Sequence, residues 1–83
     1  MPRPGPYEPE ALDVIDREGR PLAVVYRKRR LLVAAIVDTW RIDEEWWREE
    51  VSRLYFLIEL ESRKRMVVFR DLLHGGWFRQ DRV

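Results

Sequence analysis

Apolar and polar positions alternate most clearly in residues 53–61. The apolar members of this alternation are Leu54, Phe56, Ile58 and Leu60, and the main polar members are Arg53, Tyr55, Glu59 and Glu61. Successive side chains of a β-strand point to opposite faces, so the spacing predicts a half-exposed strand whose apolar set faces a core. Tyr55 is expected on the face that meets solvent.

Other short apolar segments predict further strands on either side of this one. They cover residues 12–16, 21–27, 31–38, 65–71 and 77–80, with turn residues such as Gly19 and Gly75-Gly76 between some of them. Residues 31–37 are apolar at every position, which predicts a strand that is buried on both faces or bent across a barrel. A short buried helix is the alternative, because periodicity alone does not separate the two.

Short connections between these six segments favour an antiparallel meander over parallel crossovers, which need about a dozen residues or more. A short meander hides its edges best by curling up. We therefore predict an all-β fold, a small antiparallel six-stranded meander curled into an SH3-like barrel. At most one short helical turn is expected, near residues 43–48, where Asp43 would cap it.

The beginning of the chain is predicted to lie outside the sheet. Four of the five prolines fall within residues 1–9, which predicts a flexible leader over residues 1–10 and a single β-barrel domain over residues 11–83. Residues 1–6 lack the apolar core of a signal peptide, and the apolar run at 31–37 is too short to span a bilayer. A cytoplasmic location without membrane contact is therefore expected.

Composition narrows the classes of function. The 16 basic and 15 acidic residues nearly cancel, which argues against a purely electrostatic nucleic-acid binder. The chain has no cysteine, so no thiolate nucleophile, disulfide framework or zinc ribbon is expected. Among the basic residues only Lys28 and Lys64 are lysines, a dominance of arginine that resembles a thermophile composition.

The titratable residues do not predict an enzyme. Arginines at 41, 48 and 53 are interleaved with the acids of residues 43–50, which favours a solvated ion network over a metal site or an acid–base pair. His74 is the only histidine and precedes two glycines, so it is expected in a turn. No hydroxyl residue is spaced with a base and no Gly-rich phosphate loop is present, so we predict no catalysis, no metal and no cofactor.

Three of the four tryptophans lie in residues 40–47, between two apolar segments. The aromatic residues are too numerous for all of them to fit inside so small a barrel, and core packing is expected for Trp40, Phe56, Phe69 and Trp77. The adjacent Trp46 and Trp47 cannot easily point the same way. We predict a partner-binding surface made of Trp46, Trp47, Arg48 and Tyr55.

Two basic runs occupy predicted hairpin tips. They consist of Arg27, Lys28, Arg29 and Arg30 in the first tip and Arg63, Lys64 and Arg65 in the second. If both project toward the same end of the barrel, they would contact phosphates while exposed Tyr55, Trp46 or Trp47 stacked on bases. Direct DNA binding is thus the alternative function, although charged tips also keep any sheet protein soluble.

Landmarks in a fixed order run from Trp40 to Gln80. They are Arg41-Ile42-Asp43, Trp46-Trp47, residues 51–56, residues 68–71 and Gly76-Trp77-Phe78. This order resembles the C-terminal tail module of ImuB-type proteins, the catalytically inactive Y-family polymerase homologues of bacterial mutasome cassettes, and an uncharacterised small bacterial domain family. The resemblance covers about half of the chain, which has no polymerase homology region.

The resemblance implies an accessory role in DNA damage tolerance, linked to translesion synthesis, and a protein partner such as a polymerase or recombinase-like mutasome component. It implies no catalytic residues. We therefore expect a non-enzymatic binding module, with a protein partner favoured over DNA. The chain is expected to be a monomer, or a homodimer that pairs through an open barrel edge.

Overall fold

A computed structural model describes residues 9–46 and 49–80 of the chain, which are all strand, turn or irregular structure. The strands are β1 (Glu10–Arg17), β2 (Arg20–Tyr26), β3 (Arg29–Trp46), β4 (Glu49–Leu60), β5 (Arg65–Asp71) and β6 (Trp77–Arg79). The prediction of an all-β chain is confirmed. Of the predicted leader, residues 1–8 lie outside the described residues, and Glu10 already belongs to β1.

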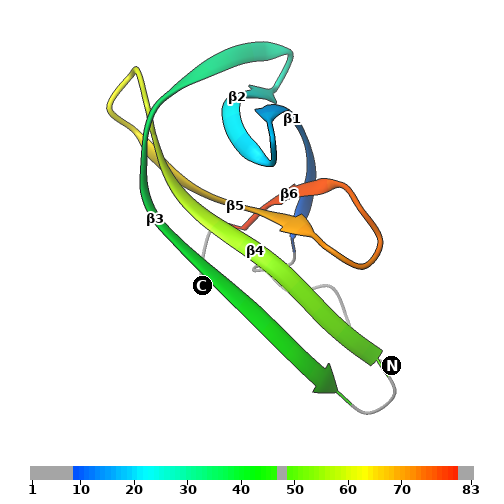
Figure 1. Ribbon diagram of the computed structural model, residues 1–83. Coiled ribbons are helices and arrows are strands. Elements are labelled where there is room, and N and C mark those ends of the chain that lie inside the picture. Colours follow the sequence, from blue (N-terminus) through cyan, green and yellow to red (C-terminus); the bar gives the residue numbers. More distant parts are fainter. Residues whose placement is uncertain (1–8, 47–48, 81–83) are drawn as a thin grey trace.

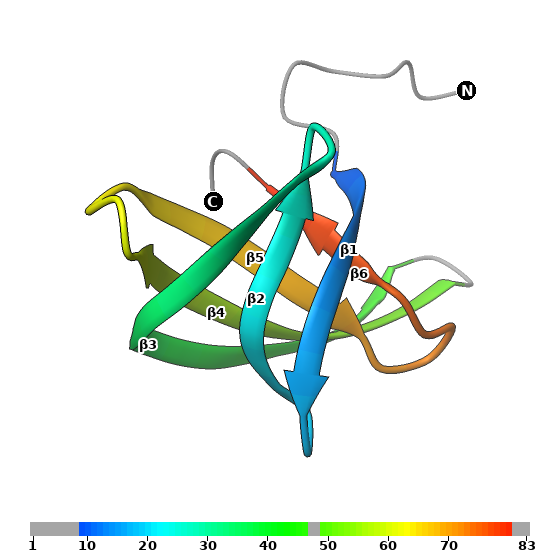
Figure 2. The same ribbon diagram turned by 90° about the horizontal axis from the view of Figure 1, so that it is seen from above.

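The six strands form a closed barrel in sequence order (Figures 1 and 2). Each strand pairs antiparallel with the next, and β6 pairs antiparallel with β1 through three residue pairs centred on Ala11 and Phe78. The predicted antiparallel meander and its closure into a barrel are therefore confirmed. The finer assignment to the SH3-like type stays a prediction.

Strand β3 is much longer than predicted and changes partner along its length. Its residues 29–32 pair with β2, and residues 33–46 pair with β4. The register shifts between Val33 and Ala35 and again between Ile36 and Asp38, and such irregularities bend a strand. The predicted bend is thus confirmed, whereas burial on both faces is wrong, because Leu32 and Val37 are 47% and 43% exposed.

The interior of the barrel is filled by one apolar cluster from three strands. Its buried members are Val24, Phe56, Ile58, Leu60 and Val68. The alternation in β4 predicted three of these five positions correctly, and Leu54 packs against the cluster as a partly buried neighbour. Trp77 does the same, with its ring centroid 5.7 Å from that of Phe56.

A second apolar layer lies on the opposite face of the sheet. Register pairs place Trp40, Tyr55, Phe69 and Phe78 in one row across β3, β4, β5 and β6. Neighbouring ring centroids in this aromatic row are 5.3, 4.9 and 5.2 Å apart, within the range of favourable aromatic pairs. Tyr55 and Phe69 are only 3% and 1% exposed, so the predicted exposure of Tyr55 is wrong.

Polar side chains help to cover the aromatic row. The guanidinium of Arg53 lies 4.5 Å from the ring centroid of Phe69 and donates a hydrogen bond of 3.3 Å to the hydroxyl of Tyr55. That hydroxyl donates in turn to Oε1 of Gln80 at 3.1 Å. Tyr55 is therefore a core residue with a satisfied hydroxyl, and it offers little surface to a partner.

The hairpin of β3 and β4 extends past β5. Pairing of β4 with β5 begins at Arg53, so Asp43–Trp46 of β3 and Glu49–Ser52 of β4 form a two-stranded arm beyond the barrel. Figure 1 shows this arm pointing away from the β2–β3 and β4–β5 turns. The helical turn allowed near residues 43–48 does not form in its described part, because residues 43–46 continue the strand.

The turn between β5 and β6 is organised by one carboxylate. Asp71 accepts hydrogen bonds of 3.0 Å from the N–H groups of Leu73 and His74, and Nδ1 of His74 lies 3.2 Å from its second oxygen. His74 is thus a turn residue, as predicted. Partial burial raises the pKa of the Asp71 carboxyl, but the contacts with His74 and Leu73 outweigh it and leave the pKa below its usual value.

Replacing Tyr55 by Ala should lower the free energy of unfolding by about 3 kcal/mol, because a buried aromatic ring leaves a cavity between its neighbours. Urea denaturation followed by tryptophan fluorescence measures the change. The control Glu61→Ala removes an exposed side chain and should stay within about 0.5 kcal/mol of the wild type. A Tyr55→Ala chain as stable as the control would contradict the position of this ring in the core.

The low pKa of Asp71 also predicts a dependence of stability on pH. Because the folded-state pKa lies below the unfolded one, its contribution is present above about pH 4 and is lost as pH falls through the folded-state pKa. Asp71→Asn keeps an oxygen acceptor but does not titrate. Its unfolding free energy should therefore fall less than that of the wild type between about pH 5 and pH 2. Equal losses in urea titrations at both pH values would refute this.

Candidate functional site

The β2–β3 turn presents two cations on a strained backbone. It consists of Arg27 and Lys28, which both have positive φ values, 52° and 65°. Two-residue hairpin turns with both residues in this region favour Asn-Gly, and a left-handed residue with a side chain costs about 1–2 kcal/mol. The turn between β1 and β2 instead places Gly19 at its second position. The sequence therefore has two cations at positions where Asn-Gly would adopt the backbone conformation at lower cost.

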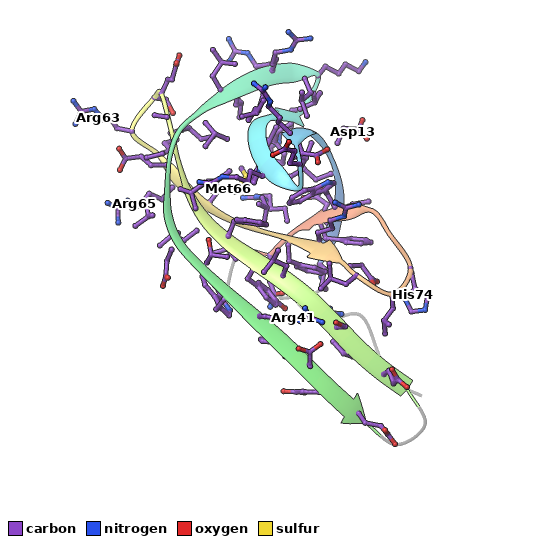
Figure 3. All side chains as sticks on the ribbon, viewed as in Figure 1. Asp13, Arg41, Arg63, Arg65, Met66 and His74 are labelled. Carbon is purple, nitrogen blue, oxygen red and sulfur yellow. The ribbon has the colours of Figure 1, made fainter. Side chains whose placement is uncertain are left out.

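The β4–β5 turn brings a second basic run to the same region. It is closed by backbone hydrogen bonds from Leu60 N–H to Lys64 C=O at 2.8 Å and from Arg63 N–H to Leu60 C=O at 2.9 Å. Arg63 has a φ of 77° and points outward from the turn, as does Arg65, while Met66 points inward (Figure 3). The turn thus directs two cations outward, and the apolar Met66 that follows it reaches into the barrel.

The two basic hairpins meet at one cavity of about 430 Å³, here called the basic cavity. Its basic residues are Arg27, Arg29, Lys64, Arg65 and Arg79, and its other lining residues are Tyr26, Leu31, Leu60, Ser62 and Met66. No carboxylate is among these described lining residues. The cavity therefore combines several positive charges with an apolar floor that is continuous with the interior of the barrel.

Tyr26 positions two of these arginines. The guanidinium carbons of Arg27 and Arg79 lie 5.1 and 4.7 Å from its ring centroid, within the range of cation–π contacts. Arg79 also donates a hydrogen bond of 3.1 Å to the Tyr26 hydroxyl. Because the Tyr26 side chain is half-buried, it fixes both cations at the wall of the cavity instead of leaving them to swing in solvent.

Ion pairing leaves the basic cavity with an excess of positive charge. Arg65 pairs with Glu59 at 3.2 Å on the outer face, and Arg79 lies 3.5 Å from Glu10. Within residues 9–46 and 49–80, no ion pair is formed by Arg27, Arg29 or Lys64. These three cations are therefore available to an anion, and an anion bound there would be held by charge-assisted hydrogen bonds.

The predicted DNA-binding residues are thus only partly gathered. Arg27, Arg29, Lys64 and Arg65 line the basic cavity, whereas Lys28, Arg30 and Arg63 do not. Arg30 lines a neighbouring depression of about 230 Å³ with Glu61 and Ser62. The sequence reasoning missed Tyr26 and Arg79. The alternation in β2 and β6 is the only sequence pattern that bears on these two residues. It does not show which face of each strand points inward, so it did not identify them.

The predicted partner-binding surface cannot be assembled from the described residues. Trp47 and Arg48 lie outside them, and Trp46 is placed only as the last residue of β3. Tyr55, the fourth member, is buried in the aromatic row. The prediction of a tryptophan contact surface at this position stays a prediction.

One acid of the arm, Asp43, forms an ion pair of the expected network. Ser52 donates a 2.6 Å hydrogen bond to Asp43, and Arg41 Nε lies 2.7 Å from the same carboxylate. These two contacts, that with Ser52 first, hold the pKa of the Asp43 carboxyl below its usual value. In the part of the chain that the structure describes, no three His, Asp or Glu side chains gather to hold a metal ion.

A helix capable of crossing a membrane is not found among residues 9–46 and 49–80. Comparisons of the chain with protein-family models, curated proteins and solved structures found no match. The resemblance to the tail module of ImuB-type proteins is therefore neither supported nor contradicted by relatives, and the functional argument depends on the basic cavity itself.

Proposed function

We propose that the chain is a non-enzymatic binding module that holds single-stranded nucleic acid in the basic cavity. The observation that carries the proposal is the convergence of two hairpins, distant in sequence, whose cations surround one cavity. Phosphates would contact Arg27, Arg29 and Lys64, which have no described ion pair. Neutralised phosphates release counterions, and this release supplies most of the affinity of such sites.

The floor of the cavity favours a single strand over a duplex. Leu31, Leu60 and Met66 are apolar, and the Tyr26 ring stands beside them. A volume of about 430 Å³ suffices for one unstacked base with its sugar, whereas the bases of a duplex are held inside the helix. An aromatic or apolar surface under a basic rim is the usual design of sites that bind single strands without sequence preference.

The distribution of charge over the whole molecule supports the same proposal. The net charge is only +1, which alone would predict weak attraction to a polyanion. Four of the exposed acids, Asp43, Glu44, Glu45 and Glu50, however, lie on the arm, which points away from both basic hairpins (Figure 1), whereas the exposed Glu61 lies at the β4–β5 turn. Every charged residue that lines the cavity is basic, so the local charge there is more positive than the net charge of +1 indicates.

Binding of a fluorescein-labelled single-stranded oligonucleotide should depend steeply on salt. With three to five phosphate contacts, log K should fall against log salt with a slope of about −2 to −3.5. Charge reversal by Arg29→Glu or Lys64→Glu should weaken binding at least tenfold at 50 mM salt, by the same electrostatic reasoning. Fluorescence anisotropy measures both effects.

The matched control is Arg20→Glu, an equal change of charge at the start of β2 and outside the cavity lining. It should change the affinity less than threefold, because Arg20 and the cavity lie at opposite ends of β2 and salt partly screens a charge at that distance. Failure of DNA and RNA single strands to bind at 50 mM salt would refute the proposed function. Preference for a duplex would refute the role of the apolar floor.

The strained β2–β3 turn predicts a trade between stability and binding. Arg27→Asn with Lys28→Gly fits the positive φ values of the turn and should raise the unfolding free energy by about 1–2 kcal/mol while weakening oligonucleotide binding. The control Glu18→Asn relieves the same strain at the β1–β2 turn, where φ is 52°. It should stabilise the fold without weakening binding, and equal effects of the two variants on binding would contradict the assignment.

A protein partner, a role in DNA damage tolerance and a cytoplasmic location stay predictions of the sequence. The described residues add no observation in favour of the tryptophan surface at 46–48. A single-strand binder would nevertheless suit an accessory protein of DNA damage tolerance, because replication past lesions exposes single-stranded DNA. The resemblance and the basic cavity are therefore compatible.

A further inference from the structure

The long strand β3 has an edge that no described strand covers. Pairing with β2 stops at residue 32, and β4 lies on the other side of residues 33–46. Along the arm and the segment before it, one side of β3 therefore has no neighbour within residues 9–46 and 49–80. An edge of this kind presents a row of backbone donors and acceptors to any strand that approaches.

One hydrogen bond establishes which backbone groups face this edge. The N–H of Leu72 donates to the C=O of Ser52 at 2.9 Å, so Ser52 directs its backbone groups away from β3. Ser52 lies opposite Asp43, and two opposed residues of a pair without mutual hydrogen bonds both face outward. Asp43 therefore directs its N–H and C=O to the open edge, and by alternation so do Arg41 and Glu45.

One donor at the barrel end of this edge is already occupied. The N–H of Thr39, which follows the same alternation, donates to the side chain of Asp38 at 2.8 Å. This cap removes one donor, so Thr39 can pair with an incoming strand through its C=O alone. From Arg41 onward no such side-chain cap occurs among the described residues, so the pairing surface is the arm and the residues that lead into it.

We infer that the arm edge of β3 pairs antiparallel with the same edge of a second copy, about a two-fold axis at Ile42. This register places Arg41 opposite the partner's Asp43 and Asp43 opposite the partner's Arg41. Opposed side chains of antiparallel strands lie about 4.5–5.5 Å apart and attract when their charges differ. Ile42 meets the partner's Ile42 on the other face, so the contact is self-complementary, as a two-fold interface requires.

The charge sequence selects this register over its neighbours. An axis at Arg41 would set Arg41 opposite its own copy. An axis at Asp43 would set Arg41 opposite the partner's Glu45 but Asp43 opposite its own copy, and an axis at Glu44 would set Asp43 opposite the partner's Glu45. The axis at Ile42 pairs opposite charges without any like-charged pair. Arg41 and Asp43 also pair with each other within the chain at 2.7 Å, but their side chains are 59% and 55% exposed, so both can contact a partner as well. Two-stranded ribbons are marginally stable in water, and pairing of β3 with its copy produces a four-stranded sheet of β3 and β4 from both chains.

A single engineered cysteine tests the axis, because the chain contains none of its own. Ile42→Cys should form an intermolecular disulfide at least tenfold faster than Glu44→Cys under mild oxidation. In the proposed register only residue 42 lies within about 7 Å of its own copy, the limit for bridging Cα atoms. Non-reducing gel electrophoresis over time gives both rates, and equal rates for the two variants would overturn the register.

Charge exchange tests the contact without covalent chemistry. Sedimentation velocity up to about 200 µM should find a dimer for the wild type, because pairing of this kind follows mass action. Arg41→Asp and Asp43→Arg should each weaken dimerisation at least tenfold, and the double variant should restore it. Glu50→Arg, on β4 and away from the edge, is the control and should leave the dimer intact.

A wild type that stays monomeric at every concentration would overturn the inference. It would do so even if a strand from another protein were found to bind the edge. Failure of the double variant to restore the dimer would overturn the proposed charge pairs. None of these positions lines the basic cavity. Oligonucleotide binding by each variant therefore checks that its barrel is folded, and the proposed function is tested independently of the dimer.

Discussion

The pairing of β3 with β4 is the interaction on which the other features of this molecule depend. One strand of 18 residues first pairs with β2, bends at two register shifts, and then runs along β4 to the end of the arm. The bends carry the chain from one side of the barrel to the other. Because of these bends, the β2–β3 turn lies near the β4–β5 turn, and the arm formed by β3 and β4 points away from both turns.

The sequence predicts the strands better than it predicts the faces of the sheet. Alternation in β4 identified Phe56, Ile58 and Leu60 as interior residues because a buried face was assumed on one side only. The same assumption placed Tyr55 in solvent, whereas Trp40 and Phe69 of the two neighbouring strands pack against its ring. A single strand carries no information about what covers its second face, since that depends on register with distant segments.

The candidate site was predictable to a similar extent. Basic runs at hairpin tips are visible in the sequence, and their convergence followed from the meander if the hairpins closed as expected. Arg79 was not visible, because an arginine in a three-residue strand gives no sign that it will lie against a tyrosine of β2. The arm was missed because acids and tryptophans in a row fit a turn as well as an extended ribbon.

The arm carries four exposed acids and points away from the basic hairpins, so the net charge of +1 hides an uneven distribution of charge over the molecule. Near a polyanion, such a molecule experiences a torque that turns its basic side forward and its arm outward. Salt confines this effect to about one Debye length, roughly 8–10 Å, so orientation is set in the last step of approach. In the proposed binding of nucleic acid, the direction of approach would therefore be selected only at short range.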